Sequence, residues 1–216
     1  MRRSEKRHRA DVPIDYVIYG QSLNTEVNPK LMRSLLHQFD AAVVATGARA
    51  DLAALPAPES SDVLVTAQDI ALGRITPAHR VVVIGGGKIG LTLAESLKSS
   101  GHEVAVVESE KRIAGDVMPS WKWRHTAWIE ELDIPTFTKS RVVRIGVGGV
   151  TLLNGEGEER QILADMVIAA APSRGNQELV AELEWSIDEL HVCGDCVTPR
   201  GLTQDIHDGY RLGCRL

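Results

Sequence analysis

The clearest chemistry in this sequence lies in three glycines, Gly85, Gly87 and Gly90, which are spaced as G-x-G-x-x-G. An apolar β-branched run at 80–84 precedes them, and a run rich in helix formers at 91–100 follows. In such a unit the first glycine permits a sharp turn, the second lets a pyrophosphate approach the backbone, and the third lets the helix pack closely. Free N–H groups and the helix dipole then attract phosphate. The motif therefore predicts a dinucleotide site.

An acidic residue stands where such a site requires one. Glu108 follows a second apolar strand at 103–107 and lies 18 residues beyond Gly90. Its carboxylate can accept hydrogen bonds from an adenosine ribose and would repel a 2′-phosphate, so we expect NAD(H) rather than NADP(H). Lys111 and Arg112 are near enough in sequence to moderate that preference.

Two further residues of the loop, Lys88 and Ile89, complete the expected cofactor contacts. The Lys88 side chain can reach a phosphate. The alternative interpretation is that it extends into solvent and contacts no ligand. For the whole stretch, the alternative is a glycine turn in an α/β protein that binds no nucleotide.

Composition excludes several classes of protein. The chain has 216 residues, a formal net charge of −5, 44% hydrophobic and 25% charged residues. It has no basic excess that would indicate nucleic acid as a partner, and no apolar run near the roughly 20 residues of a membrane span. The N-terminus lacks the apolar segment of a signal peptide. Its three cysteines do not form a secreted disulfide framework, so we expect a cytoplasmic protein.

The apolar patterns predict an α/β fold in which a parallel sheet is crossed by an antiparallel meander. The expected strands are 15–19, 41–45, 80–84, 103–107, 135–138, 141–145, 150–153, 161–163, 165–171 and 190–193. The expected helices are 29–39, a short one capped by Thr66 and Asp69, 91–100, 120–132 and 203–214. Asn154-Gly155 is read as the turn of a hairpin.

Tryptophans cluster in the fourth of these helices. Trp121, Trp128 and Leu132 fit one helical stripe. Such a stripe can be an aromatic platform for a ring, but core or a domain interface is the reading that we favour. His125, beside them, has no metal-ligand spacing around it. We name no metal ligand in the chain.

The last strand ends in Gly194-Asp195 and is followed by a helix. A strand that ends in Gly-Asp and points at a helix start can hold a ribityl chain or a phosphate. The same stretch contains Cys193 and Cys196, which fit C-x-x-C. A redox pair needs a cysteine at an exposed helix N-terminus, whereas Cys193 should be buried in the strand, so we do not expect a dithiol.

These segments together resemble a known family. The order 45–48 (ATGA), 85–90 (GGGKIG), 165–168 (DMVI) and 194–196 (GDC) is similar to the pyridine-nucleotide–disulfide-reductase-type module. Residues 192–210 resemble the C-terminal part of old-yellow-enzyme-related NADH:flavin oxidoreductases, a group that includes 2,4-dienoyl-CoA reductase and trimethylamine dehydrogenase. The similarity extends from about Asp15 onward.

The resemblance implies two Rossmann-like lobes. Residues 79–171 would be the NAD(P)H-binding lobe, inserted in a partial FAD-type lobe made of 1–78 plus 172–216. The flavin nucleotide would lie against Thr46, Gly47, Gly194 and Asp195, and NAD against Gly85, Gly87, Gly90 and Glu108. The catalytic barrel of the family, with its FMN and iron–sulfur cluster, has no counterpart in the sequence.

The flavin lobe of the family begins with its own G-x-G-x-x-G, and this sequence has no such motif before residue 85. NAD(H) is therefore the expected cofactor, and FAD would need a partner subunit or a second copy to complete its lobe. Three functions follow: an NADH-dependent flavin oxidoreductase component or a fragment of one, an NAD- or ADP-binding module without turnover, or an assembly subunit of a larger oxidoreductase. Hydride transfer between rings requires positioning more than acid–base groups, so we expect no catalytic side chain.

Overall fold

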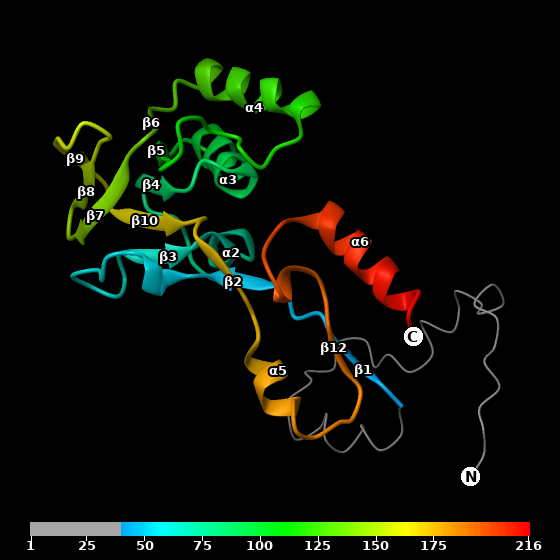
Figure 1. Ribbon diagram of the computed structural model, residues 1–216. Coiled ribbons are helices and arrows are strands. Elements are labelled where there is room, and N and C mark those ends of the chain that lie inside the picture. Colours follow the sequence, from blue (N-terminus) through cyan, green and yellow to red (C-terminus); the bar gives the residue numbers. More distant parts are fainter. Residues whose placement is uncertain (1–39) are drawn as a thin grey trace, which may run out of the picture. The chain divides into compact units, whose positions relative to one another are not determined.

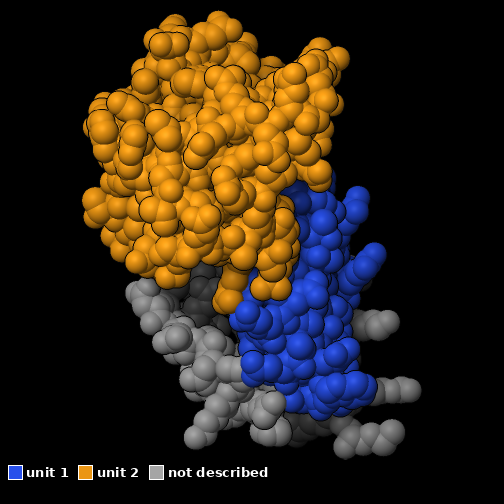
Figure 2. Space-filling model, turned by 90° about the vertical axis from the view of Figure 1, so that its left-hand side faces the viewer, with its two compact units in different colours: residues 1–48, 175–216 blue, residues 49–174 orange. Residues whose placement is uncertain are grey.

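The computed structural model describes residues 40–216 (Figure 1). The strand expected at 15–19 and the helix expected at 29–39 lie outside the described residues. The chain divides into two compact units, Met1–Ala48 with Gly175–Leu216, and Arg49–Arg174, which Figure 2 colours blue and orange. We call them unit 1 and unit 2. No helix among residues 40–216 is long and apolar enough to cross a membrane.

Unit 2 is built on a five-stranded sheet in the order β3-β10-β4-β5-β6, with every neighbouring pair parallel. The strands are β3 (Leu64–Thr66), β4 (Arg80–Ile84), β5 (Glu103–Val107), β6 (Thr136–Phe137) and β10 (Met166–Ala169). In the register, Val82 of the central strand lies between Ala105 and Val167. The buried β-branched residues of β4 and β10 have the composition that parallel sheets require.

Helices pack against one face of this sheet. They are α2 (Ala67–Ala71), α3 (Lys88–Ser99) and α4 (Pro119–Glu131). Leu91 and Ala94 of α3, both fully buried, join Val83 of the sheet and Ile129 of α4 in one core cluster. The helix α3 starts three residues earlier than expected and ends before Gly101, whose φ of +91° is that of a C′ glycine.

An antiparallel meander packs against the other face. It consists of β7 (Arg141–Gly146), β8 (Gly149–Leu153) and β9 (Glu159–Leu163), and its Ile145, Val150 and Leu152 share a core cluster with Val82. The hairpin turn spans Asn154–Glu158 instead of the two residues expected. The Asn154 side chain accepts the Glu156 and Glu158 N–H groups, and Gly157 takes the positive φ of +85°. The parallel sheet with a crossing meander is therefore confirmed.

In unit 1, β1 (Ala42–Val44) pairs in parallel with β12 (Leu190–Val192). The described part of the unit also contains α5 (Glu178–Leu183), the 3-10 turn η4 (Gly194–Cys196) and α6 (Leu202–Gly213). Leu183 of α5 packs with Ala42, Val44 and Cys196. The helix α6 buries none of its residues, and its apolar stripe of Leu202, Ile206 and Tyr210 is 63–73% exposed.

The two chain segments that pass between the units form a short pair of strands, β2 (Ala48–Ala50) and β11 (Ser173–Gly175), and the 3-10 turn η3 (Leu52–Ala54) follows β2. The units divide at 48/49 and 174/175, whereas the lobes expected from sequence divide at 78/79 and 171/172. The stretch from 49 to 78 belongs to unit 2 because β3 pairs with β10 there. Which cofactor each lobe binds stays a prediction.

Candidate functional site

The glycine loop connects β4 to α3, and its first and third glycines have the geometry that the motif predicts. Gly85 takes a φ of +109° and donates its N–H to the Val107 carbonyl at 2.8 Å, which turns the chain sharply off the strand. A Cβ on Gly90 would lie 1.8 Å from the Gly85 carbonyl oxygen, so only glycine permits this approach of helix to loop. The loop backbone therefore lies directly at the α3 N-terminus.

Glu108 lies beside this loop. Its Oε2 accepts the Gly86 N–H at 2.7 Å, and its Oε1 accepts the Glu110 N–H at 2.8 Å. Oε1 also accepts the Ser109 hydroxyl at 3.2 Å. A carboxylate has about four lone-pair positions, so the position left for another donor is on Oε2. A ribose diol supplies such donors, and this carboxylate is held in place by backbone groups.

A second carboxylate, which sequence reasoning missed, lies on the loop. The Oδ1 of Asp116 accepts the backbone N–H of Lys88 at 2.8 Å. A Cβ on Gly87 would lie 2.9 Å from Asp116 Oδ2, so the carboxylate covers the space that the second glycine leaves open. No local pattern reveals this contact, because Asp116 and Lys88 are 28 residues apart.

Lys88 and Ile89 occupy the first turn of α3, and both are exposed. Their side chains are therefore accessible to a ligand at the helix N-terminus. Two cavities of unit 2, of about 290 Å³ and 260 Å³, are lined by other residues, including Thr66 and Asp69 in the first and Ser140 in the second.

The residues expected near a flavin come together in unit 1. Thr46 Oγ1 donates to the Asn176 carbonyl at 2.6 Å, and the Gly47 carbonyl accepts the Asn176 N–H at 2.8 Å. Gly47 and Gly194 take positive φ angles of +69° and +72°. The loop after β1 and the turn after β12 are thus joined through Asn176 and Cys196, since Cys196 Sγ donates to the Asn176 carbonyl at 3.0 Å.

Asp195 holds the loop that leads into α6. Its Oδ1 accepts the N–H groups of Arg200 at 2.7 Å and Gly201 at 3.0 Å. Burial acts to raise the pKa of Asp195, but these backbone hydrogen bonds outweigh it and lower the pKa below its ordinary value. Burial and the nearby Asp195 charge raise the pKa of Asp205.

Two buried acceptors in the described part of this unit have no partner there. The side-chain oxygens Asn176 Oδ1 and Asp205 Oδ1 are inaccessible to solvent and accept no hydrogen bond from residues 40–216. Such groups call for a donor, because an unsatisfied buried polar atom costs about 1–3 kcal/mol. Hydroxyl groups of a ligand, or water, would supply that donor.

The cysteines are free thiols. Cys196 is fully buried and Cys193 only half-buried, so the expectation that Cys193 would be the buried member is wrong. The reason is that the β12 strand ends at Val192, and the chain turns into η4 there. Burial and the nearby Asp208 charge raise the pKa of the Cys193 thiol, which disfavours a reactive thiolate.

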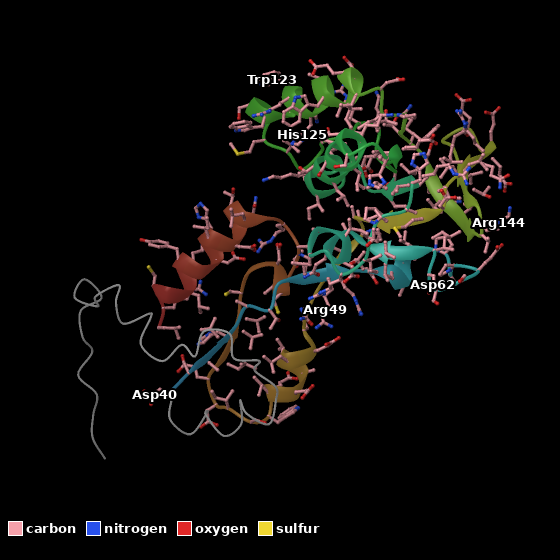
Figure 3. All side chains as sticks on the ribbon, turned by 180° about the vertical axis from the view of Figure 1, so that it is seen from behind. Asp40, Arg49, Asp62, Trp123, His125 and Arg144 are labelled. Carbon is pink, nitrogen blue, oxygen red and sulfur yellow. The ribbon has the colours of Figure 1, made fainter. Side chains whose placement is uncertain are left out.

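The tryptophans of α4 are not core. Trp121 and Trp128 are 55% and 36% exposed, and only Ile129 of this helix is buried. Arg124 stacks over the Trp128 ring at 4.3 Å from its centroid. The Nδ1 of His125 is instead hydrogen-bonded to Oε1 of the buried Glu95 of α3, at 2.8 Å. Figure 3 labels His125 and the exposed Trp123. For these rings the expectation of a core position is therefore wrong, and the expectation of a domain interface stays a prediction.

Residues 26–207 match the family described as pyridine nucleotide-disulphide oxidoreductase. A metal reductase from Desulforamulus reducens is 26% identical over 218 residues, covering 87% of this chain and 32% of the relative. An NADH oxidase from Thermoanaerobacter brockii is 27% identical, covering 82% of this chain and 28% of the relative.

Among solved structures, a 2-naphthoyl-CoA reductase in complex with 2-naphthoyl-CoA superposes with a TM-score of 0.80 at 28% identity. The superposition covers 90% of this chain and 29% of the reductase chain. A histamine dehydrogenase from Rhizobium sp. 4-9 shares the fold, with a TM-score of 0.76 at 19% identity over 89% of this chain and 32% of that one. The chain thus spans about a third of these relatives.

Proposed function

This chain belongs to the pyridine nucleotide-disulphide oxidoreductase family, and we propose that it binds NADH at the glycine loop and presents it to a flavin. In this proposal the chain is a component of an NADH:flavin oxidoreductase of the old-yellow-enzyme-related type. The NADH-binding lobe is 79–171, and the residues that contact the cofactor are Gly85, Gly87, Lys88, Ile89, Gly90 and Glu108.

The observation that carries this proposal is the pairing of Glu108 with the glycine loop. The Glu108 carboxylate is fixed by the Gly86 N–H at 2.7 Å and, with Oε1 accepting from Glu110 and Ser109, keeps a lone pair on Oε2 for a ribose hydroxyl. The space beside the Gly87 Cα can hold an oxyanion, because the Asp116 carboxylate lies there in this structure. Both halves of an ADP moiety therefore find groups of the right chemistry at one helix N-terminus.

In this proposal NADH would supply a hydride and the flavin would accept it, so the reaction chemistry would reside in the two cofactors. The protein residues bind and orient. The Glu108 carboxylate would fix the ribose, while the N–H groups at the α3 N-terminus would hold the pyrophosphate. No side chain has to move a proton in this scheme, and we assign no catalytic residue.

The described part of unit 1 fits only one portion of a flavin nucleotide. The unpartnered acceptors Asn176 Oδ1 and Asp205 Oδ1 lie near Gly194 and Thr46, where ribityl hydroxyls would satisfy them. Thr46, Gly47, Gly194 and Asp195 are therefore the proposed flavin contacts. The described residues of this unit contain no glycine-rich phosphate loop, so the pyrophosphate would need another segment.

A partner or a second copy is the proposed source of that segment. The exposed stripe of Leu202, Ile206 and Tyr210 on α6 is an apolar helix face that a completed lobe would cover. The relatives are about three times as long as this chain, which agrees with a larger assembly. We further propose a cytoplasmic location, in keeping with the free thiols of Cys193, Cys196 and Cys214.

A second function is a nucleotide-binding module without turnover, in which NAD or ADP has a structural or regulatory role. The observation that favours it is the two-stranded β1–β12 sheet, which leaves the flavin lobe unfinished in the described residues. An assembly subunit with a vestigial nucleotide fold is less consistent with the Glu108–Gly86 pairing.

The visible absorbance spectrum separates these functions. The purified protein is incubated with FAD, freed of excess FAD, and measured under anaerobic conditions before and after NADH is added. The proposal predicts flavin absorbance that bleaches with NADH. Saturable NADH binding without retained flavin would support the module without turnover, and absence of both would point to the assembly role.

A further inference from the structure

We infer that Asp116 occupies the phosphate position of the glycine loop in the free protein and must leave it when NADH binds. Its carboxylate would then set the affinity for every ligand that brings an anionic group to this loop. The inference rests on the proposed function, because it takes the α3 N-terminus as the site of the NADH pyrophosphate.

The contacts of Asp116 are those expected of a bound anion. The first N–H groups of an α-helix have no intrahelical acceptor. Asp116 Oδ1 accepts the N–H of Lys88, the first residue of α3, at 2.8 Å. Asp116 Oδ2 lies 2.9 Å from the position that a Cβ on Gly87 would occupy. A carboxylate at this position also interacts favourably with the helix dipole.

The segment that carries Asp116 is anchored on both sides of it. The Ala114 N–H donates to the Gly86 carbonyl at 2.7 Å, and the Ala114 side chain is fully buried. Val117, on the other side, is also buried, and its N–H donates to the Ala114 carbonyl at 3.3 Å. Asp116 itself is exposed, so rotation of its side chain can vacate the position while the segment stays in place.

Binding of a pyrophosphate therefore competes with an internal anion. One N–H group cannot donate fully to both acceptors, and two negative charges on one helix end repel each other. The competition acts on NADH and ADP, whose phosphates enter the loop. It does not act on adenosine, which has the ribose for Glu108 but no phosphate.

The experiment compares Asp116→Ala and Asp116→Asn with the wild-type protein, with Asp133→Asn as the matched control. Asp133→Asn makes the same change of charge at the C-terminal end of α4. Dissociation constants for NADH, ADP and adenosine are measured by calorimetry. The free energy of a helix N-terminal cap corresponds to a factor of about 2 to 30 in an equilibrium constant. Asp116→Ala should therefore bind NADH and ADP more tightly by about that factor. Asp116→Asn should fall between, and adenosine binding should not change.

The backbone amide resonance of Lys88 reports the displacement itself. In the free protein, Asp116→Ala should shift this resonance, because the N–H loses its acceptor. In the NADH-saturated protein, the wild type and the variant should show the same Lys88 resonance. A difference that persists at saturation would mean that Asp116 stays in place, and it would overturn the inference.

The outcomes for this inference and for the proposed function are distinguishable. If the wild type and Asp116→Ala bind NADH with equal affinity, the inference is wrong and the proposed NADH site stands. If neither protein binds NADH or ADP, both are wrong. If Asp133→Asn tightens binding as much as Asp116→Asn does, the effect is one of net charge, which also overturns the inference.

Discussion

The carboxylate of Glu108 accepts the backbone N–H of Gly86 at 2.7 Å and thereby joins the end of β5 to the glycine loop after β4. The acidic residue expected to hold a ribose is thus oriented by the same loop that is expected to hold the pyrophosphate. The two expected halves of the site form one structural unit, and a change to either should affect the other.

The first prediction concerns this residue. Glu108→Ala should weaken NADH binding by roughly 5- to 150-fold, the equivalent of about 1–3 kcal/mol for a lost charged acceptor. It should also lessen the discrimination against NADPH, since the like charge is gone. Glu110→Ala, an exposed acid two residues on, is the control and should bind as the wild type does. Calorimetric titration measures both; equal loss in the two variants would refute the role of Glu108.

The second prediction concerns Gly90. A Cβ at this position would lie 1.8 Å from the Gly85 carbonyl oxygen, which belongs to the backbone and cannot move aside cheaply. Gly90→Ala should therefore destabilise the protein by at least about 3 kcal/mol or prevent it from folding. Gly101→Ala, where a Cβ meets no atom within 4 Å, should cost only about 1 kcal/mol because of its positive φ. Urea unfolding followed by circular dichroism compares the two, and similar losses would contradict the prediction.

The third prediction concerns the pair of His125 and Glu95, whose side chains are 14% and 8% exposed. His125→Ala leaves the Glu95 carboxylate buried without its partner, so unfolding should become easier by about 2 kcal/mol. Trp123→Ala, on the exposed side of the same helix, should change stability by less than about 0.5 kcal/mol. Chemical denaturation gives both values. A larger loss for Trp123→Ala would show that the ring has a packing role in the folded protein.

The fourth prediction concerns pH. Arg80 binds both carboxylate oxygens of Asp165, at 2.5 Å and 3.0 Å, and these hydrogen bonds lower the pKa of Asp165 below its ordinary value of 3.8. Since the folded-state pKa is the lower one, the ionised carboxylate stabilises the fold above the ordinary pKa. That contribution is lost as pH falls through the folded-state value. Asp165→Asn should therefore lower the melting temperature at pH 7, with the difference disappearing in strong acid. A melting-temperature difference between the two proteins that stays constant from pH 7 to pH 2 would contradict the prediction.

Local patterns were sufficient to predict the elements that position the loop. The β-branched runs at 80–84 and 103–107 became β4 and β5 with the expected bounds. The Thr66–Asp69 capping interaction is present, with the Asp69 N–H donating to Thr66 Oγ1 at 3.1 Å. Each of these features depends on residues that are neighbours in sequence, which is why periodicity and capping rules identify them.

Features that depend on tertiary packing were not predictable in this way. Trp121 and Trp128 have the helical spacing of a core stripe, yet both are substantially exposed because α4 packs through Ile129. Asp116 reaches Lys88 only through the fold of the loop after β5. A sequence pattern states which residues can share a face, but not which face another element covers.

The most direct test of the central claim is calorimetric titration of NADH into the wild type and Gly87→Val. A side chain at residue 87 would displace the Asp116 carboxylate and enter the space where the pyrophosphate is expected. The backbone there, with φ near −80°, tolerates valine. We predict saturable binding to one site per chain in the wild type, and no detectable binding in a variant whose circular dichroism spectrum is unchanged. No binding by the wild type, or equal affinity in the folded variant, would contradict the assignment of the glycine loop as the NADH site.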